Sequence, residues 1–549
     1  YLKSNSLCVI PADKEGGFAV FSYNCFSEKA GQAISAVFNE RKDVSIAKVA
    51  ARASEICSKL NLDKLRKNIL RSDKKALDVF FSAKTHKEGV PFRVIISERC
   101  TWQKQVALYL LSKLNVLEID DPFLVKSSDE VLEFVRCNAE KGLKAFSADV
   151  KDLYYSIPHN DLLQCVKDCI DRYGAIRFSQ EAGVSVEGFL ELLHFYLSST
   201  FVQWNDRPHL QKKGICIGSC LAPVLSNLYL AQLDRHMCER LTGITVFQRA
   251  FRFVDDFLVF LDCPNNSFQE KCADVSTICR ECLRPLDVTF EVPTNNKLRF
   301  LDVQFISTDS RTCWAYSPRA NKPLLQFHSA HSKLVKRGIT NMCLKNALKK
   351  SCPHLMKSSF QQQSSRLKEA GYPNQVLVSV AEKLLKQKRS GQCPHENARA
   401  SGRPQMKTAV IPYIHQISHS LKKIGSRANV RVVFSAPNKL SNLCKTTNPM
   451  RTKKPVCDKN HKKEFVGCAV GVVYRIPLSC GRCYIGQTGR CINDRLREHK
   501  NKVQSVSGDG FLALHCKTCP CRPLLDDTAI INRNKREYVR LIIETEQII

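Results

Sequence analysis

The sequence predicts an α+β protein of two to four domains, because its length and its patterning both point that way. A chain of 549 residues is longer than one hydrophobic core usually serves. Strand-like segments are mixed with segments of helical periodicity along the chain. Hydrophobic residues make up 44% of the chain and charged residues 25%, which is ordinary for a globular protein in water. The net charge of +32 favours a polyanionic partner, most simply nucleic acid, over a generally basic protein without one.

Targeting signals are few. No apolar run approaches the roughly 18 residues of a membrane span, and no signal peptide opens the chain, so we expect no membrane partner. The 27 Cys are scattered, and without a secretory signal most should be buried free thiols in a reducing compartment. Because residue 1 is Tyr, we expect the natural N-terminus to lie upstream.

The first hundred residues hold a candidate phosphate site. Residues 1–30 predict two short strands joined by a Gly turn, and residues 45–80 predict helices with a basic face. Lys84 and Arg93 then flank a Gly-Val-Pro turn that leads into a strand. Arg forks onto phosphate oxygens and Lys acts as a point charge, so the pair could bracket one phosphate group. Ordinary surface charges around a loop are the alternative.

Asp149 is predicted to end a strand, with Val150 next to it and Tyr154 and Tyr155 at the start of a helix. An acid in that position can face a metal ion shared with another strand. A tyrosine ring beside it could pack under a sugar and reject a 2′-hydroxyl, or it could fill the core.

Small residues precede an apolar helix within residues 211–230. Gly218 and Ser219 would let a backbone approach a base or a sugar closely. Tight packing of the helix is the alternative reading.

Asp255 and Asp256 stand between two apolar runs that favour strands, so we expect them at a hairpin tip. Burying two neighbouring carboxylates is costly, and a divalent cation with oxygen ligands removes that cost. A solvated Asp-Asp turn is the alternative. Beyond the hairpin, a strand is expected near residue 290, and the basic, helical residues 320–410 suit a clamp on the phosphates of a duplex.

In this order the motifs resemble those of reverse transcriptases, most of all those of Penelope-like retroelements, over about residues 8–345. The resemblance implies a right-hand polymerase fold with fingers, palm and thumb. It implies that Asp149, Asp255 and the Val150 carbonyl hold two Mg²⁺ ions, with Asp256 in support. It also implies that dNTPs are bound by Lys84, Arg93, Tyr154, Gly218 and Ser219. The motifs that carry it are Ala12-Asp13-Lys14, Lys84-Thr85-His86-Lys87, Asp149-Val150-Lys151-Asp152-Leu153-Tyr154, Gln211, Gly218-Ser219, Pro223, Asp255-Asp256 and Leu301-Asp302-Val303.

A second module is predicted at the C-terminal end. Residues 411–440 suggest a small αβ unit, and residues 445–464 a basic linker that could also serve as a nuclear localisation patch. We expect a nuclear protein. Residues 470–549 predict a strand with Tyr474, a hairpin partner with Tyr484, a helix that carries Arg495 and His499 on one face, and a final helix with Glu544.

This module resembles a GIY-YIG endonuclease, with Val472-Val473-Tyr474 as a degenerate first triplet and Tyr484-Ile485-Gly486 as an intact second one. The resemblance implies that Tyr474 and Tyr484 flank the attacking water and that Arg495 stabilises charge on the scissile phosphate. It implies that Glu544 binds one Mg²⁺, with Glu546 as the fallback. His499 is expected to assist as a proton carrier near neutral pH.

A zinc site is predicted inside the module. Cys480 and Cys483 form a Cys-x-x-Cys pair, and a His and further Cys residues follow at ligand-like spacing. Penelope-like endonucleases carry a zinc-finger-like insertion in this place. We expect Zn²⁺ to be held by Cys480, Cys483, His515 and Cys519, with Cys521 as the alternative to Cys519. Unligated thiols in a Cys-rich chain are the other reading.

Together these predictions give four parts: fingers and palm at 1–310, a helical thumb-like region at 311–410, a small αβ unit and linker at 411–465, and a GIY-YIG endonuclease with a zinc-finger-like insertion at 466–549. The resemblances imply target-primed reverse transcription: the nuclease nicks target DNA, and the polymerase extends the 3′-hydroxyl along a template RNA, making an RNA–DNA hybrid. A decayed or domesticated copy that only binds nucleic acid, and telomerase-like extension of existing ends, are the alternatives. The oligomeric state cannot be predicted from the sequence.

Overall fold

The computed structural model describes residues 1–2, 4–14, 16–308, 310–318, 323–329, 331–389, 407–414, 417–436, 461, 464–505, 509–534 and 536–548. The chain divides into two compact units, Tyr1–Thr447 and Asn448–Ile549. Within the described ranges, no helix is long and apolar enough to cross a membrane. Most of the predicted basic linker falls outside them, including Lys445, Arg451, Lys453, Lys454, Lys459, Lys462 and Lys463.

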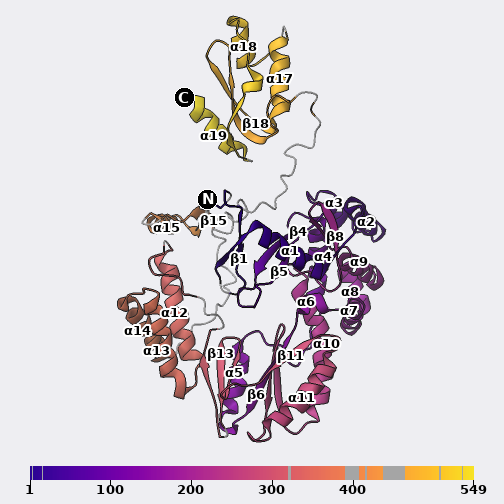
Figure 1. Ribbon diagram of the computed structural model, residues 1–549, viewed down its shortest axis with the longest axis vertical. Coiled ribbons are helices and arrows are strands. Elements are labelled where there is room, and N and C mark those ends of the chain that lie inside the picture. Colours follow the sequence, from indigo (N-terminus) through magenta and orange to yellow (C-terminus); the bar gives the residue numbers. More distant parts are fainter. Residues whose placement is uncertain are drawn as a thin grey trace. The chain divides into compact units, whose positions relative to one another are not determined.

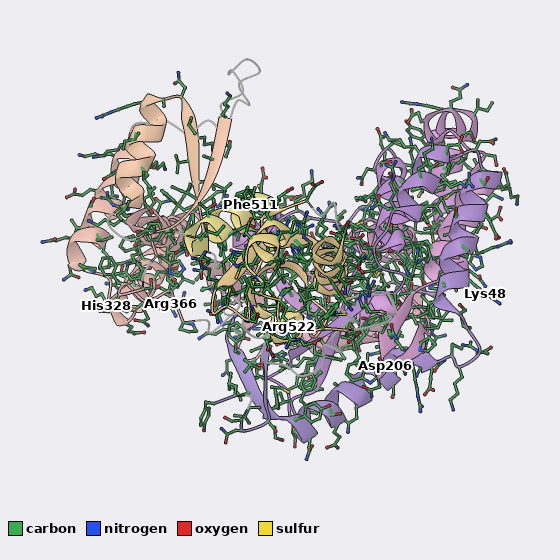
Figure 2. The ribbon with its side chains drawn as sticks, turned by 90° about the horizontal axis from the view of Figure 1, so that it is seen from above. Lys48, Asp206, His328, Arg366, Phe511 and Arg522 are labelled. Atoms are coloured by element: carbon green, nitrogen blue, oxygen red, sulfur yellow. The ribbon has the colours of Figure 1, made fainter. Side chains whose placement is uncertain are left out.

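Small sheets and helices form the N-terminal part of the first unit, which was predicted to be the fingers (Figure 1). The predicted first hairpin is present as β1 (Leu7–Pro11) and β2 (Phe18–Ser22). The β7–β8 hairpin turns through Asn205 and Asp206, which both have positive φ, as a two-residue turn of this kind requires. Asp206 and Lys48 are exposed (Figure 2). The other elements here are α1 (Tyr23–Val37), β3 (Phe38–Glu40), α2 (Ile46–Lys59), α3 (Asp63–Leu70), β4 (Asp78–Ala83), β5 (Phe92–Ser97), α4 (Trp102–Leu114), α9 (Val186–Ser198), β7 (Phe201–Trp204) and β8 (Arg207–Gln211).

An antiparallel four-stranded sheet forms the palm-like centre of the unit, in the order β11-β6-β10-β9. Its strands are β6 (Lys144–Val150), β9 (Phe247–Phe253), β10 (Asp256–Leu261) and β11 (Val288–Glu291). Side chains alternate between the two faces of a strand. Phe146 and Phe257 therefore join the large helical core, whereas Ala145 and Phe260 face a second core. Both faces are thus buried, which holds the two central strands β6 and β10 in a fixed register.

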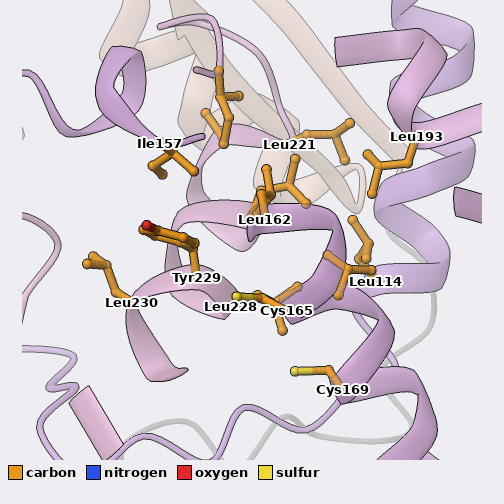
Figure 3. Close-up of a cluster of buried hydrophobic side chains, with 14 of the residues drawn as sticks. Leu114, Ile157, Leu162, Cys165, Cys169, Leu193, Leu221, Leu228, Tyr229 and Leu230 are labelled. Atoms are coloured by element: carbon orange, nitrogen blue, oxygen red, sulfur yellow. The ribbon is translucent and has the colours of Figure 1, made fainter. Parts of the chain in front are cut away.

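Helices form the large core together with the first face of this sheet. They are α6 (Leu153–Ser156), α7 (His159–Tyr173), α8 (Ala175–Ala182), α10 (Ala222–Thr242) and α11 (Phe268–Cys282). Figure 3 shows the packing of α7 against α10, where Leu162 and Cys165 meet Leu228 and Tyr229. The helix α5 (Ser128–Cys137) contributes Val131, Leu132 and Val135 to the second core.

A three-stranded sheet and three helices follow the palm sheet. The sheet contains β12 (Lys297–Phe300), β13 (Val303–Ser307) and β14 (Thr312–Tyr316). The predicted boundary between residues 310 and 311 is therefore misplaced, because β14 pairs with β13 and belongs to the preceding sheet. The predicted helical region is present as α12 (Lys333–Lys349), α13 (Pro353–Glu369) and α14 (Asn374–Arg389).

The small αβ unit begins earlier than predicted. Strand β15 (Lys407–Pro412) pairs in parallel with β16 (Val430–Ser435), and α15 (Ser418–Arg427) connects them. The unit therefore starts at residue 407 rather than 411, because a parallel pair needs the whole of the first strand and a crossover helix.

The second unit is a three-stranded antiparallel sheet with helices. The sheet order is β18-β17-β19, with β17 (Val470–Pro477), β18 (Cys483–Cys491) and β19 (Ala529–Arg533). The helices are α17 (Ile492–Gln504), α18 (Phe511–Thr518) and α19 (Glu537–Ile548). Its core joins Val472, Tyr474 and Ile476 of β17 to Ile492 and Leu496 of α17.

Candidate functional site

Three carboxylates meet at one end of the central sheet. Asp149 on β6 lies directly opposite Asp256 on β10, and Asp255 lies in the turn between β9 and β10. Carboxylate oxygens of the three residues all lie within 4.8 Å of one another. The backbone ties the strands together here, because the Val150 N–H donates to the Asp255 carbonyl over 3.0 Å.

The electrostatics of this acidic group favour a cation. Desolvation, together with the charges of Asp255 and Asp256, raises the pKa of Asp149 to about 6. A hydrogen bond with Asp256 acts in the same direction, and only Lys14 opposes it. Three oxygen-donor side chains that repel one another are the ligand set that Mg²⁺ neutralises.

A buried network of ion pairs supports the turn between β9 and β10. Arg252 on β9 is fully buried and pairs with Asp234 of α10 and with Asp121. Its Nη1 also donates to the Val254 carbonyl over 3.1 Å. Val254 has φ +59°, which is strained for a β-branched residue, so this donor helps to keep the turn in shape. No local pattern in the sequence signals this support.

The basic residues of the predicted phosphate site pair with Asp152 and Asp13. Lys84 is half-buried, and its Nζ lies 3.9 Å from Asp152, in the turn just after β6. Burial lowers the pKa of Lys84, while Asp152 raises it. Arg93 on β5 pairs with Asp13 over 3.2 Å. Asp13 and Lys14 belong to the Ala12-Asp13-Lys14 motif, and no pattern in the sequence indicates that they lie near Arg93 and Asp149.

Tyr154 also lies at the acidic group. It is half-buried on α6, close enough to Asp255 for that charge to add to the burial that raises its pKa, and it hydrogen-bonds Ser226 of α10. Tyr155 turns inward instead, and its hydroxyl donates to the Val94 carbonyl over 3.1 Å. Of the two tyrosines, only Tyr154 lies where a ring could contact a substrate sugar.

Gly218 and Ser219 make close contacts inside the protein, which is nearer to the alternative reading of the sequence, tight packing, than to nucleotide contact. Gly218 has φ +104°, and a Cβ there would lie 2.1 Å from the Ile96 carbonyl oxygen. Ser219 is buried, and its hydroxyl lies 2.7 Å from that of Tyr196, which donates to the buried Glu98. The side chain of Ser219 is therefore engaged inside the protein, and Gly218 permits a close backbone contact.

The predicted nuclease residues gather in the second unit. Tyr474 on β17 is fully buried, and its hydroxyl lies 2.8 Å from Nε2 of His499 on α17. The ring of Tyr484 packs edge-on against His499, with centroids 5.1 Å apart. Gly486 makes this possible, because a Cβ there would lie 2.8 Å from the Tyr474 hydroxyl.

The charged members of the group are Arg495 and Glu544. Arg495 hydrogen-bonds Tyr474 and pairs with Glu498 over 3.0 Å. Burial raises the pKa of Glu544, and Arg495 is near enough to lower it. The fallback residue Glu546 is exposed. Helix α19 is docked by the buried Arg540, whose Nε donates to Gln487 Oε1 over 2.9 Å.

His499 differs from its predicted state. Burial and the neighbouring Arg495 together lower its pKa to about 4. A neutral imidazole can accept a hydrogen bond from Tyr474 when its proton is on Nδ1. Burial beside a guanidinium therefore favours the neutral ring over a proton carrier that titrates near neutral pH.

The predicted zinc ligands are corrected in one position. Cys480, His515, Cys519 and Cys521 lie with ligand atoms within 4.8 Å of one another, and Cys480 Sγ lies 3.5 Å from His515 Nε2. Cys483 is exposed and is not part of this group. It starts β18 opposite Pro477, beyond a turn at Gly481, whereas Cys480 lies in that turn. Cys519 and Cys521 both take part, rather than one as the alternative to the other.

Comparison with known proteins bears on the first unit. Residues 86–290 match the family model described as "Reverse transcriptase (RNA-dependent DNA polymerase)", a span that includes Asp149, Asp255 and Asp256. A search of curated protein sequences found no match.

Solved structures give distant likenesses. Telomerase from Candida albicans in complex with a fragment of telomeric RNA is 11% identical, with 72% of this chain and 69% of that chain covered and a TM-score of 0.44. Truncated apo telomerase from Candida tropicalis is 14% identical, with 55% of this chain covered and a TM-score of 0.38. The present chain spans 63% of that truncated chain. A polymerase complex inside a double-stranded RNA virus is 9% identical, with 62% and 30% covered and a TM-score of 0.33. With TM-scores below 0.5, these likenesses carry no argument about function.

Proposed function

We propose that the chain is an RNA-directed DNA polymerase that copies a template RNA from a DNA 3′-end created by its own second unit. This is target-primed reverse transcription by a Penelope-like retroelement protein with a GIY-YIG endonuclease. Residues 86–290, which match the reverse transcriptase family model, support the polymerase half. The observation that carries the polymerase half is the meeting of Asp149, Asp255 and Asp256 at one sheet end.

The three acids fit Mg²⁺, the ion that reverse transcriptases generally use. Asp149 and Asp255, with the Val150 carbonyl, would hold two Mg²⁺ ions, and Asp256 would support them. Bound there, the ions supply Lewis acidity for the primer 3′-hydroxyl and neutralise the charge of the leaving pyrophosphate. The turn at Val254 and the register of β6 against β10 keep the carboxylates in place for that ligation.

Other residues of the first unit would orient the substrate. Lys84 and Arg93 offer cationic groups at the mouth of the site, where they would contact the phosphates of an incoming dNTP. Tyr154 offers a ring beside Asp255 that would pack under the sugar. Gly218 and Ser219 would act on the nucleotide only through the backbone that they position.

The proposed nuclease half rests on the group of Tyr474, Tyr484, Arg495, His499 and Glu544. The residues fit one Mg²⁺ at Glu544. Burial raises the pKa of that carboxyl, and a bound cation would favour its charged form. Arg495 would place a guanidinium on the scissile phosphate, and neutral His499 would orient the Tyr474 hydroxyl toward the attacking water. Zn²⁺ held by Cys480, His515, Cys519 and Cys521 would stabilise the hairpin that carries Tyr484.

In this proposal the partners are template RNA, target DNA, the RNA–DNA hybrid and dNTPs, and the protein works in the nucleus. The net charge of +32 supports binding to two nucleic acids.

Primer extension on an RNA template tests the polymerase half. Asp255→Asn should abolish extension, whereas Asp262→Asn, which removes one exposed acid after the same strand, should not. Equal extension by the wild type and Asp255→Asn would contradict the proposal. No extension by the wild type would favour a decayed copy.

Nicking of supercoiled plasmid tests the nuclease half. Arg495→Ala and Glu544→Gln should each lower nicking by roughly 10²-fold or more, and both should still extend a pre-nicked primer. Lys500→Ala removes an exposed charge from the same helix and serves as the control. If Glu546→Gln abolishes nicking instead, the metal ligand is Glu546. A wild type that extends free 3′-ends and never nicks would favour telomerase-like use of existing ends.

A further inference from the structure

We propose that the second unit binds a zinc ion at His461, Cys468 and Cys491, separately from the group around Cys480. The three side chains come from the segment before β17 and from the junction between β18 and α17. Their ligand atoms all lie within 4.8 Å of one another. The His461 side chain is 1% exposed and Cys491 is buried, so the group lies inside the unit.

The distance between the His461 and Cys491 donor atoms matches that around a tetrahedral ion. Zinc binds sulfur at about 2.3 Å and nitrogen at about 2.0–2.1 Å, so a tetrahedral angle puts the two donors about 3.5–3.6 Å apart. Cys491 Sγ lies 3.4 Å from His461 Nε2. In the group around Cys480, the corresponding sulfur–nitrogen distance is 3.5 Å. Two thiolates and one imidazole form a soft ligand set that favours Zn²⁺ over Mg²⁺.

Neighbouring side chains are arranged as they are around bound metals. Asp494 Oδ1 lies 3.4 Å from Nδ1 of His461, on the opposite side of the ring from Cys491. A carboxylate in this position favours the tautomer that leaves Nε2 to the metal; Nη2 of Arg497, which can only donate, also lies 3.5 Å from the same Nδ1. The Asn493 amide donates to Cys468 Sγ over 3.5 Å, as N–H groups do to thiolates. Arg497 pairs with Asp494 over 3.7 Å, which places its charge on the carboxylate.

The charge of the ion and the protons of its ligands balance when it binds. Both thiols lose their protons to solvent when they ligate, and the two thiolates then neutralise Zn²⁺. The three protein ligands leave the fourth tetrahedral position to water or to another donor.

The ion would join the start of the unit to the start of α17. The same junction is already bridged by Asn493, whose Oδ1 accepts from the Phe465 N–H over 2.9 Å. Cys491 is the N-cap of α17, the helix that carries Arg495 and His499. A metal at Cys491 would therefore fix the helix on which both candidate nuclease residues lie. A metal-free thiol–imidazole hydrogen bond is the alternative explanation of the contact.

Zinc content of the purified full-length chain, measured by plasma mass spectrometry, tests the proposal. We expect Cys468→Ser/Cys491→Ser to hold one zinc ion fewer per chain than the wild type. We expect the same loss in Cys480→Ser/Cys521→Ser, a variant that leaves the proposed site itself unchanged. Cys483→Ser, which changes an exposed cysteine outside both groups, should keep both ions. After exchange into cobalt, thiolate-to-Co²⁺ charge-transfer absorption should fall in each double variant.

Two results would overturn the proposal. One is a Cys468→Ser/Cys491→Ser variant that holds as much zinc as the wild type. The other is a folded Cys480→Ser/Cys521→Ser variant, checked by circular dichroism, that holds none. Zinc counting needs no nicking or extension, so its outcome is independent of the proposed function.

Discussion

Replacing Asp149 with Asn should stabilise the metal-free protein while it abolishes polymerisation. In the wild type, Asp149 shares a small volume with Asp255 and Asp256, and its pKa is raised from 3.8 to about 6. The unfolded chain loses this proton at lower pH than the native protein does. The free energy of unfolding therefore falls as pH rises from about 4 to about 6, and the full penalty remains at higher pH.

The magnitude follows from the shift. Two pKa units correspond to about 3 kcal/mol at most, at about 1.4 kcal/mol per unit. Asp149 is exposed to solvent, which screens the interaction, so we expect a gain of about 1 kcal/mol at pH 7.5 in Asp149→Asn. At pH 4.5 the gain should shrink to about a third. With Mg²⁺ at 100 times its dissociation constant, the wild type should gain about 2.7 kcal/mol and the variant much less.

Urea unfolding followed by tryptophan fluorescence is a suitable assay, because Trp102, Trp204 and Trp314 all lie in the first unit. Asp262→Asn removes the same charge away from the acidic group and should shift neither the unfolding midpoint nor the Mg²⁺ effect. If Asp149→Asn lowers the midpoint in EDTA, or responds to Mg²⁺ as the wild type does, the three acids do not form the cation site described here.

Three further outcomes are expected. Gly218→Ala should cost about 2–4 kcal/mol in the same urea assay, since its Cβ would meet the Ile96 carbonyl at 2.1 Å; a neutral effect would mean that the contact relaxes freely. Gly486→Ala should displace Tyr474 and lower plasmid nicking with primer extension unchanged, and normal nicking would count against the placement of that tyrosine. The single-turnover nicking rate should show no inflection near pH 6.5 from His499, whose charge change lies near pH 4; an inflection near 6.5 that disappears in His499→Gln would refute this.

The sequence predicted the elements that depend on local pattern. The β9–β10 hairpin with its acids at the tip follows from apolar runs on either side of Asp255 and Asp256, and continuous apolar runs of this kind are typical of strands whose two faces are both buried. The helices after residue 333 likewise follow from their periodicity.

What the sequence could not supply was contact between distant segments. The pairing of Arg93 with Asp13 depends on how two separate hairpins meet, and nothing near either residue encodes it. The Cys-x-x-Cys spacing suggested Cys483 as a ligand, but Cys483 lies in strand β18, beyond the turn at Gly481. Cys521, which is distant in sequence, lies in the group with Cys480 instead. Gly218 shows the same limit, since only the structure reveals that its neighbour is the Ile96 backbone.

The buried trio of Arg252, Asp121 and Asp234 has a consequence for judging whether related copies still work. Removing one member of such a trio leaves uncompensated charge in the interior, which typically costs 3–5 kcal/mol. A related chain could keep Asp149, Asp255 and Asp256 and still lack the proposed cation site, because the hairpin would no longer present them. A comparison of related chains should therefore score these three interior positions alongside the acids themselves.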